Sequence, residues 1–140
     1  MWARLNPNFS MCANGKLQSP INIMTGQVVL NKRLQPLIRS YNAANVTLVD
    51  NKFNVGVRYP ENSGGMTVNG KMYNLKQMHW HAPSEHRVNG KQYAAELHLV
   101  HIADDGGVSV VAILFDYGRP DPLVTKIQNK LNELEYMVKR

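Results

Sequence analysis

The chain has 140 residues, of which 44% are hydrophobic, and a formal net charge of +6. This length suits one domain with a buried core, and the lack of any apolar run of about 18 residues argues against a transmembrane helix. The basic residues are scattered and form no cluster interleaved with aromatic residues. Their pattern is typical of a solvated surface and does not support a nucleic-acid-binding module.

The start of the chain, Met1-Trp2-Ala3-Arg4-Leu5-Asn6-Pro7, has neither the apolar core nor the small-residue cleavage site of a signal peptide. We therefore expect either a cytosolic protein or an incomplete amino terminus. The single cysteine, Cys12, cannot form an intrachain disulfide. It is either a free thiol or half of a disulfide bond whose other half is missing from this sequence.

Most of the chain has the pattern of β-strands. Two strands are expected around Asp50-Asn51, where β-branched and aromatic residues flank a polar turn. Asn69-Gly70 and Asn89-Gly90 each predict a hairpin, because both residues of the pair tolerate positive φ. The strands expected on either side of these three turns are Val46–Val49 and Phe53–Tyr59, Met66–Val68 and Lys71–Leu75, and His86–Val88 and Lys91–His98.

An apolar, β-branched run, Val108–Phe115, predicts a strand that is buried on both faces. Only the end of the chain has a helical pattern. Asp121 is a suitable N-cap, Pro122 suits the first helical position, and Lys139 and Arg140 would complement the dipole in the last turn. The apolar stripe that predicts a helix packed on a sheet is Leu123, Ile127, Leu131, Leu134 and Val138.

All five histidines lie between His79 and His101. In an extended strand, residues two apart project from the same face, so His79 and His81 can point at one atom. His98, on a neighbouring strand, can supply a third imidazole. Three imidazoles and one open position are the donor set of a catalytic zinc site. Zinc in such a site lowers the pKa of bound water to about 7 and so supplies a hydroxide nucleophile.

Two polar neighbours favour the metal site over the alternative, in which strand histidines are merely satisfied core or surface residues. Gln77 shares the strand face of His79, and Glu96 shares the face of His98. Histidines that bind metal usually donate their second N–H to an acceptor of this kind, which fixes the tautomer. The spacing therefore permits both hydrogen bonds.

These residues resemble the α-class carbonic anhydrases, most closely the plant branch. The resemblance implies a mainly β fold with a central, largely antiparallel twisted sheet and peripheral helices. It also implies a zinc cofactor and the reversible hydration of carbon dioxide to bicarbonate and a proton by a zinc-bound hydroxide. It covers Trp2 to about Lys139, and the motifs that carry it are Cys12–Ile23, Gln77–His81, Ser84-Glu85-His86 and Tyr93–His101.

The resemblance also implies roles for single residues. His79, His81 and His98 would be the zinc ligands, with Gln77 and Glu96 as the acceptors behind the first and third of them. Glu85 would orient a threonine that accepts the hydrogen bond of the zinc hydroxide. Val100 and Val110 would form an apolar wall for carbon dioxide. His86 and His101 would be framework histidines that do not bind metal.

The sequence departs from the family pattern in three ways. Asn51 occupies the position of the proton-shuttle histidine and cannot titrate, so regeneration would depend on buffer. Residues 1–140 would form a single but incomplete domain, with the threonine, the support of the second ligand, several strands and the partner of Cys12 outside it. Unpaired edges and exposed apolar surface then predict a marginally stable chain that associates. No targeting segment is present, although the resemblance implies a secreted, apoplastic or plastid-stromal protein.

Two other functions compete with the zinc lyase. One is a catalytically weak or inactive relative that binds zinc or a partner or serves as a protein store, or an inactive fragment. The other is hydrolysis by Ser84, Glu85 and His86. This last hypothesis is disfavoured, because neighbours in sequence rarely have triad geometry and no nucleophile elbow surrounds the serine.

Overall fold

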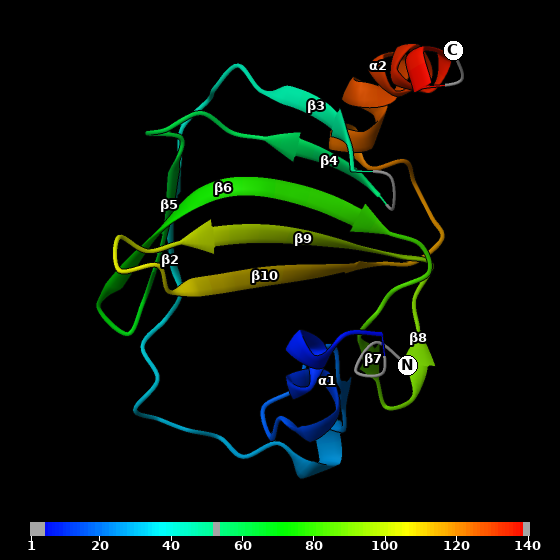
Figure 1. Ribbon diagram of the computed structural model, residues 1–140. Helices are drawn as coiled ribbons and strands as arrows, with labels where there is room; N and C mark the ends of the chain where they lie inside the picture. The colour runs from blue at the N-terminus through cyan, green and yellow to red at the C-terminus, as the bar shows by residue number, and fades with distance from the viewer. Residues whose placement is uncertain (1–4, 52–53, 139–140) are drawn as a thin grey trace.

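The computed structural model describes residues 5–51 and 54–138. Its main feature is a strongly curled antiparallel sheet, with helix α2 (Pro122–Val138) at one end and the amino-terminal segment at the other (Figure 1). The prediction of a mainly β fold with a largely antiparallel sheet and peripheral helices is confirmed. Among the described residues the sheet has seven strands, β2 (Ile38–Tyr41), β3 (Thr47–Asp50), β4 (Val55–Arg58), β5 (Gly64–Val68), β6 (Lys71–His81), β9 (Ala95–Ile102) and β10 (Val108–Phe115).

Strand β6 is the organising element of this sheet. It has 11 residues, and the part from Asn74 to His81 pairs with β9 along one side. Along the other side its first half pairs with β5 and its second half with β4. The register shifts between Leu75 and Gln77, as in a β-bulge, which re-aims the following side chains. Leu75 and Met78 are therefore both buried in the core, while Gln77 and the histidines after it face the other side.

Both Asn-Gly turns form as predicted. Asn69 and Gly70 have φ values of 50° and 78° and join β5 to β6. Asn89 and Gly90 have φ values of 50° and 80° and join the short strands β7 (Arg87–Val88) and β8 (Lys91–Gln92). The predicted strand Lys91–His98 is wrong in its continuity, because it is interrupted before β9 where the backbone N–H of Tyr93 donates to Ser84 Oγ at 2.8 Å.

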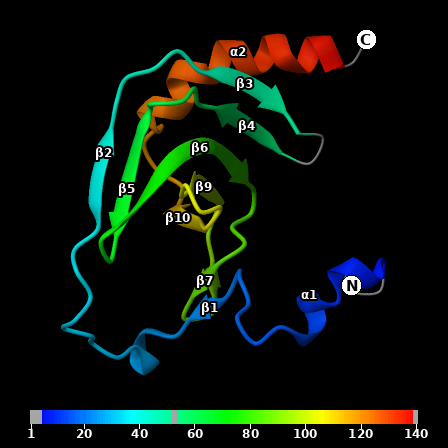
Figure 2. The same ribbon diagram turned by 60° about the vertical axis from the view of Figure 1, so that its left-hand side comes forward.

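A second, small sheet attaches the amino-terminal segment. Strand β1 (Asn22–Ile23) pairs in parallel with β7, which pairs with β8. The remaining short helical elements of this segment are η2 (Pro7–Phe9), α1 (Met11–Asn14) and η3 (Thr25–Gln27). Figure 2 shows that this segment runs beneath the large sheet, on the side away from α2.

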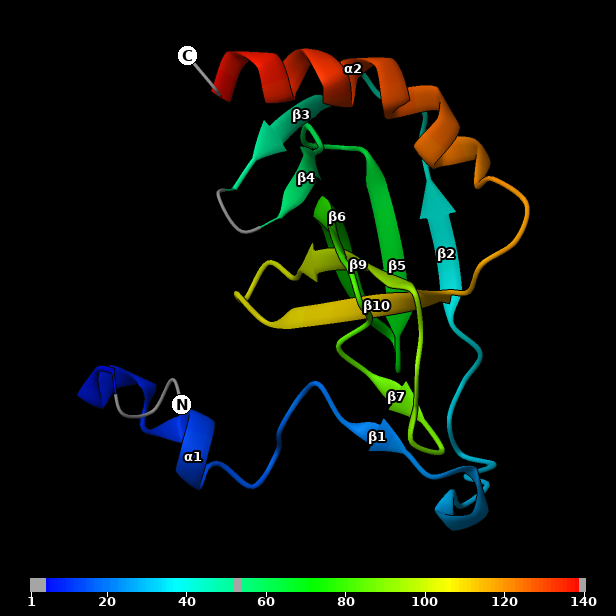
Figure 3. The same ribbon diagram turned by 90° about the vertical axis from the view of Figure 1, so that its right-hand side faces the viewer.

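The core lies on one face of the large sheet. Val57, Met78 and Leu97 are buried there, and Leu123 from the first turn of α2 packs against them. Helix α2 runs along β3 at the end of the sheet (Figure 3). Its predicted N-cap is confirmed, since Asp121 Oδ1 accepts from the backbone N–H groups of Leu123 at 2.9 Å and Val124 at 3.1 Å.

Part of the helix prediction lies outside what the structure describes, namely Lys139, Arg140 and the side chains of Leu134 and Val138. Within residues 5–51 and 54–138, no helix combines the length and apolar character that crossing a membrane requires.

Strand β10 contradicts one prediction. The run Val108–Phe115 was expected to be buried on both faces, but among the described strands β10 pairs with β9 alone and forms an edge of the sheet. Val108, Val110 and Ile113 are 62%, 47% and 42% exposed. An apolar, β-branched run predicts a strand, but its composition does not depend on whether that strand has one neighbour or two. The composition therefore did not predict the exposure of β10.

Candidate metal centre

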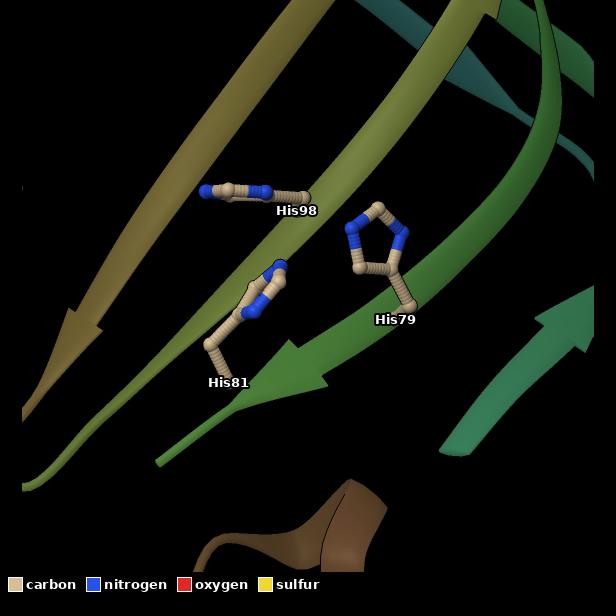
Figure 4. Close-up of side chains that lie close together, drawn as sticks. All are labelled: His79, His81 and His98. Atoms are coloured by element: carbon tan, nitrogen blue, oxygen red, sulfur yellow. The ribbon is translucent and has the colours of Figure 1, made fainter. Parts of the chain in front are cut away.

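Two adjacent strands bring three histidines together. The antiparallel pairing of β6 with β9 sets His79 directly opposite His98, and alternation along β6 sets His81 on the same face. Figure 4 shows the three rings projecting toward one another. One ring nitrogen from each histidine lies within 4.8 Å of the other two, and the ring centroids are 4.8–5.2 Å apart.

Two of the rings are held by side-chain acceptors. His79 Nδ1 donates to Gln77 Oε1 at 2.8 Å, and His98 Nε2 donates to Glu96 Oε1 at 2.6 Å. Each bond fixes a tautomer, which leaves the other nitrogen of the ring with a lone pair. His81 Nε2 is buried without a hydrogen-bond partner and lies 3.4 Å from Glu85 Oε2.

Glu96 is a buried acceptor for several groups around the site. Its side chain is 0% exposed and accepts from the backbone N–H groups of Glu85 and His86, each at 2.8 Å. It also accepts from His86 Nδ1 at 2.5 Å, besides the ring of His98. Burial raises the pKa of Glu96, but the hydrogen bonds from His86 and His98 outweigh that effect and lower the pKa to about 2. The carboxylate is therefore ionised and makes the His98 ring a better electron donor.

The surroundings of His79 favour its neutral form. Burial is the main cause of its lowered pKa, and the nearby rings of His81 and His98 lower the pKa further, whereas Glu85 raises it. A metal ligand must be a neutral imidazole, so the shift favours coordination. The half-buried rings, the fixed tautomers and the unpartnered His81 nitrogen all fit a zinc ion.

A second group of possible ligands overlaps the first. His86, Glu96 and His98 also have atoms within 4.8 Å of one another. These atoms, however, are already joined by the hydrogen bonds from both rings to Glu96 Oε1. The three-histidine group is the better metal site, because its converging nitrogens do not bond to one another.

The residues predicted for substrate lie on the same face. Val100 and Val110 are paired across β9 and β10, next to His98 along β9. Val110, with Ala112, His98 and Glu85, lines a hollow of ≈ 290 Å³, which Val100 does not line. Glu85 is 40% exposed, and its Oε2 lies 4.0 Å from His98 Nδ1.

The other two histidines make hydrogen bonds away from the three converging nitrogens. His86 Nε2 lies 3.0 Å from Ser19 Oγ, and His101 Nε2 lies 3.0 Å from the Tyr41 hydroxyl. Ser84 is 1% exposed, and its Oγ donates to the His86 carbonyl at 2.8 Å instead of contacting an imidazole. The hydrolytic triad of Ser84, Glu85 and His86 is therefore wrong.

Sequence reasoning missed a second hollow, of ≈ 340 Å³, on the His79 side of the rings. Asn51, which the resemblance places at the shuttle position, lines this hollow. Arg58 also lines it, although no sequence motif includes Arg58. The pairing of Arg58 with Gln77 across β4 and β6 brings it there. The only signal in the sequence is alternation along β4, and that does not reveal which strand is the neighbour.

Comparisons with known proteins agree with this geometry. The family model for eukaryotic-type carbonic anhydrase matches residues 1–140. Alpha carbonic anhydrase 2 of Arabidopsis thaliana is 42% identical over 134 residues, which are 95% of this chain and 55% of that protein. Dioscorin DB3L of Dioscorea polystachya is 37% identical over 133 residues, 95% of this chain and 49% of that protein. The chain thus spans about half the length of the curated relatives it matches.

Solved structures show the same likeness. The crystal structure of dioscorin complexed with ascorbate matches with a TM-score of 0.87 and 36% identity, covering 91% of this chain and 54% of that one. The α-carbonic anhydrase of Thermovibrio ammonificans, in complex with the inhibitor sulfanilamide, matches with a TM-score of 0.83 and 38% identity, covering 90% of this chain and 55% of that one.

Proposed function

The chain belongs to the eukaryotic-type carbonic anhydrase family, and from this premise we propose that it binds zinc and catalyses the reversible hydration of carbon dioxide to bicarbonate and a proton. His79, His81 and His98 would hold the metal. The observation that carries the proposal is the convergence of one nitrogen from each ring within 4.8 Å, with two rings fixed by Gln77 and Glu96.

The residues of this chain have distinct tasks in the proposed reaction. Zinc, when bound, would supply a water of lowered pKa that serves as a nucleophile near neutral pH. Gln77 and Glu96 hold His79 and His98 in the tautomers that present lone pairs to the metal. Glu96 remains ionised throughout, because hydrogen bonds hold its pKa at about 2.

Carbon dioxide would lie against the apolar side of the centre. It carries no charge and no strong hydrogen-bonding group, so a wall of small aliphatic side chains suits it. Val110 and Ala112 form such a wall beside His98, with Val100 on the same strand face. Glu85 lines the same hollow and would accept a hydrogen bond from a threonine hydroxyl, which leaves that hydroxyl oxygen as an acceptor toward the metal centre.

A second candidate function is zinc binding with little or no hydration. One observation favours it, namely that the shuttle position in the lining of the hollow beside His79 is occupied by Asn51, an amide. Proton release needs an acceptor whose pKa lies near neutrality, and an amide does not provide one.

Zinc content and carbon dioxide hydration, measured together on the chain and on His98→Ala, test the proposal. We expect about one zinc per chain in the parent, none in the variant, and hydration that a primary sulfonamide inhibits. Circular dichroism checks that the variant keeps the fold. Equal zinc in both proteins would contradict the ligand assignment. Zinc without hydration above the free-metal background would favour the second candidate.

A further inference from the structure

Arg58 lies in the hollow beside His79 and forms no ion pair or side-chain hydrogen bond within the part of the chain that the structure describes. It ends β4, opposite Gln77 of β6, and its side chain is exposed. A guanidinium has five N–H donors and stays charged at all physiological pH values. Arg58 lines the hollow, and no carboxylate among the described residues pairs with it.

The rest of the hollow also favours an anion. Gln77 Oε1 is occupied by His79, which turns the amide so that its N–H₂ group is left as a donor. Asn51 Nδ2 donates to Asn54 Oδ1 at 2.9 Å, which leaves the N–H₂ group of Asn54 as another donor. No carboxylate lines the hollow among the described residues, since Glu85 and Glu96 contact the other side of the histidine group.

Gly56 keeps this hollow open. It is paired with His79 and lies two residues before Arg58 in β4 and two residues after Asn54, which precedes the strand. A Cβ at Gly56 would lie 2.8 Å from Asn51 Nδ2, 3.2 Å from the Met78 carbonyl oxygen and 3.4 Å from Val49 Cγ2. A side chain here would therefore displace Asn51 and press on Val49, both of which line the hollow.

We propose that Arg58, with the amides of Gln77 and Asn54, forms a subsite for a carboxylate group, R–CO₂⁻, beside the metal centre. R is a hydroxyl in bicarbonate and a carbon in a small organic acid. The planar fork of arginine matches a carboxylate with two parallel hydrogen bonds, which a lysine does not reproduce. The role of bicarbonate rests on the proposed function, whereas recognition of the carboxylate itself does not.

The proposal divides the centre into two sides. Neutral carbon dioxide would use the aliphatic hollow of Val110 and Ala112, and the anion would leave through the hollow of Arg58. An organic acid bound at Arg58 would then compete with bicarbonate for the same donors. Arg58 would act as a specificity residue and not as a metal ligand.

Titration of the chain with acetate and, separately, with bicarbonate tests the subsite, followed by the backbone amide resonances of Gly56 and His79. We expect saturable shifts in the parent, affinity about tenfold weaker in Arg58→Gln and an intermediate value in Arg58→Lys. Arg33→Gln removes the same charge from an exposed loop outside the hollow and should match the parent. No saturable shift, or equal affinities in Arg58→Gln and Arg33→Gln, would overturn the proposal.

Zinc content measured on the same samples separates this inference from the proposed function. If the chain binds no zinc but its anion affinity still falls in Arg58→Gln, the subsite is supported and the proposed function fails. Zinc binding and hydration with anion affinity unchanged in Arg58→Gln would overturn the subsite alone. If Arg58→Gln weakens the binding of bicarbonate but not of acetate, the ligand of the subsite is the reaction product. If it weakens the binding of both anions, the subsite accepts carboxylates in general.

Discussion

The central strands and the amino-terminal segment use their apolar side chains in opposite ways. Leu75 and Met78 of β6 and Leu97 of β9 are 3–4% exposed. In the segment before β2, Leu17 is 99% exposed and Val29 is 88% exposed. The first region thus gains stability from buried apolar area, while the second gains little from its own.

The amino-terminal segment is attached through the loop and hairpin between β6 and β9, by the β1–β7 pairing and by polar side-chain contacts. Asn22 Oδ1 accepts from the Gly90 backbone at 2.8 Å, Thr25 Oγ1 donates to Asn89 at 3.1 Å, and Ser19 Oγ lies 3.0 Å from His86. The three converging histidines and their acceptors, in contrast, all come from β6 and β9. The candidate metal centre is therefore assembled by one pair of strands and the core beneath them.

Removing the carboxylate beneath the site should have the largest effect. Glu96→Ala leaves the N–H donors of Glu85, His86 and His98 without their buried acceptor, so we expect a loss of about 3–5 kcal/mol in the free energy of unfolding, together with loss of zinc. Urea unfolding and metal analysis measure the two effects. Glu61→Ala removes an exposed acid from a turn and should change stability by less than about 0.5 kcal/mol. Similar losses in both variants would contradict the role of Glu96.

Two matched leucine truncations should separate the regions. Leu97→Ala opens a cavity under the histidines and should cost about 2–5 kcal/mol. Leu17→Ala removes a side chain that is 99% exposed and should change stability by less than about 0.5 kcal/mol. Denaturant midpoints compare them directly. A large loss in Leu17→Ala would mean that the amino-terminal segment buries this leucine in solution and that the two regions do not differ in how they use apolar side chains.

Much of the central region was predictable because its signals are local. Asn69-Gly70 specifies a turn through the positive φ of both residues, and Asp121 caps a helix two residues away. The alternation of His79 and His81 needs only one strand. These features depend on neighbours in sequence, so one chain without structural information suffices.

The features that were missed depend on which distant strands lie side by side. Val108–Phe115 has the composition of a central strand but lies at an edge of the sheet. Arg58 approaches Gln77 only because β4 is the neighbour of the second half of β6. The burial that results from strand order is a property of the whole fold, and no local pattern reports it.

Loss of the acceptor behind the first histidine should have a smaller effect than loss of Glu96. Gln77→Ala frees the His79 ring to rotate and to change tautomer, so we expect zinc affinity to fall by about 10–100-fold with little change in the fold. Competition with a chelator measures the affinity. Gln128→Ala, at an exposed position of α2, is the matched control and should bind zinc as the parent does. Unchanged affinity in Gln77→Ala would mean that the ring is held by other contacts.

The smallest predicted effect is a pH dependence of stability in the core behind the site. His101 is 0% exposed and contacts the Tyr41 hydroxyl. Burial lowers the pKa of His101 and outweighs the backbone groups of Leu99 and Ser109, which raise it. The unfolded chain, with a histidine pKa of about 6.5, therefore binds more protons than the folded chain as pH falls below that value. Stability should fall from about pH 6.5 downward until the folded pKa is passed.

Urea midpoints of chelator-treated protein at about pH 7.5 and about pH 5.5 measure this dependence. His79 also lowers the stability of the folded chain as pH falls, because its pKa is lowered by burial as well. His101→Asn should be less stable at both pH values but should lose less on acidification, since one of the two rings whose pKa is lowered by burial is gone. Equal losses in the parent and in His101→Asn would assign the whole effect to the metal-site histidines. The pH dependence would then belong to the strand face that carries the site and not to the core beneath it.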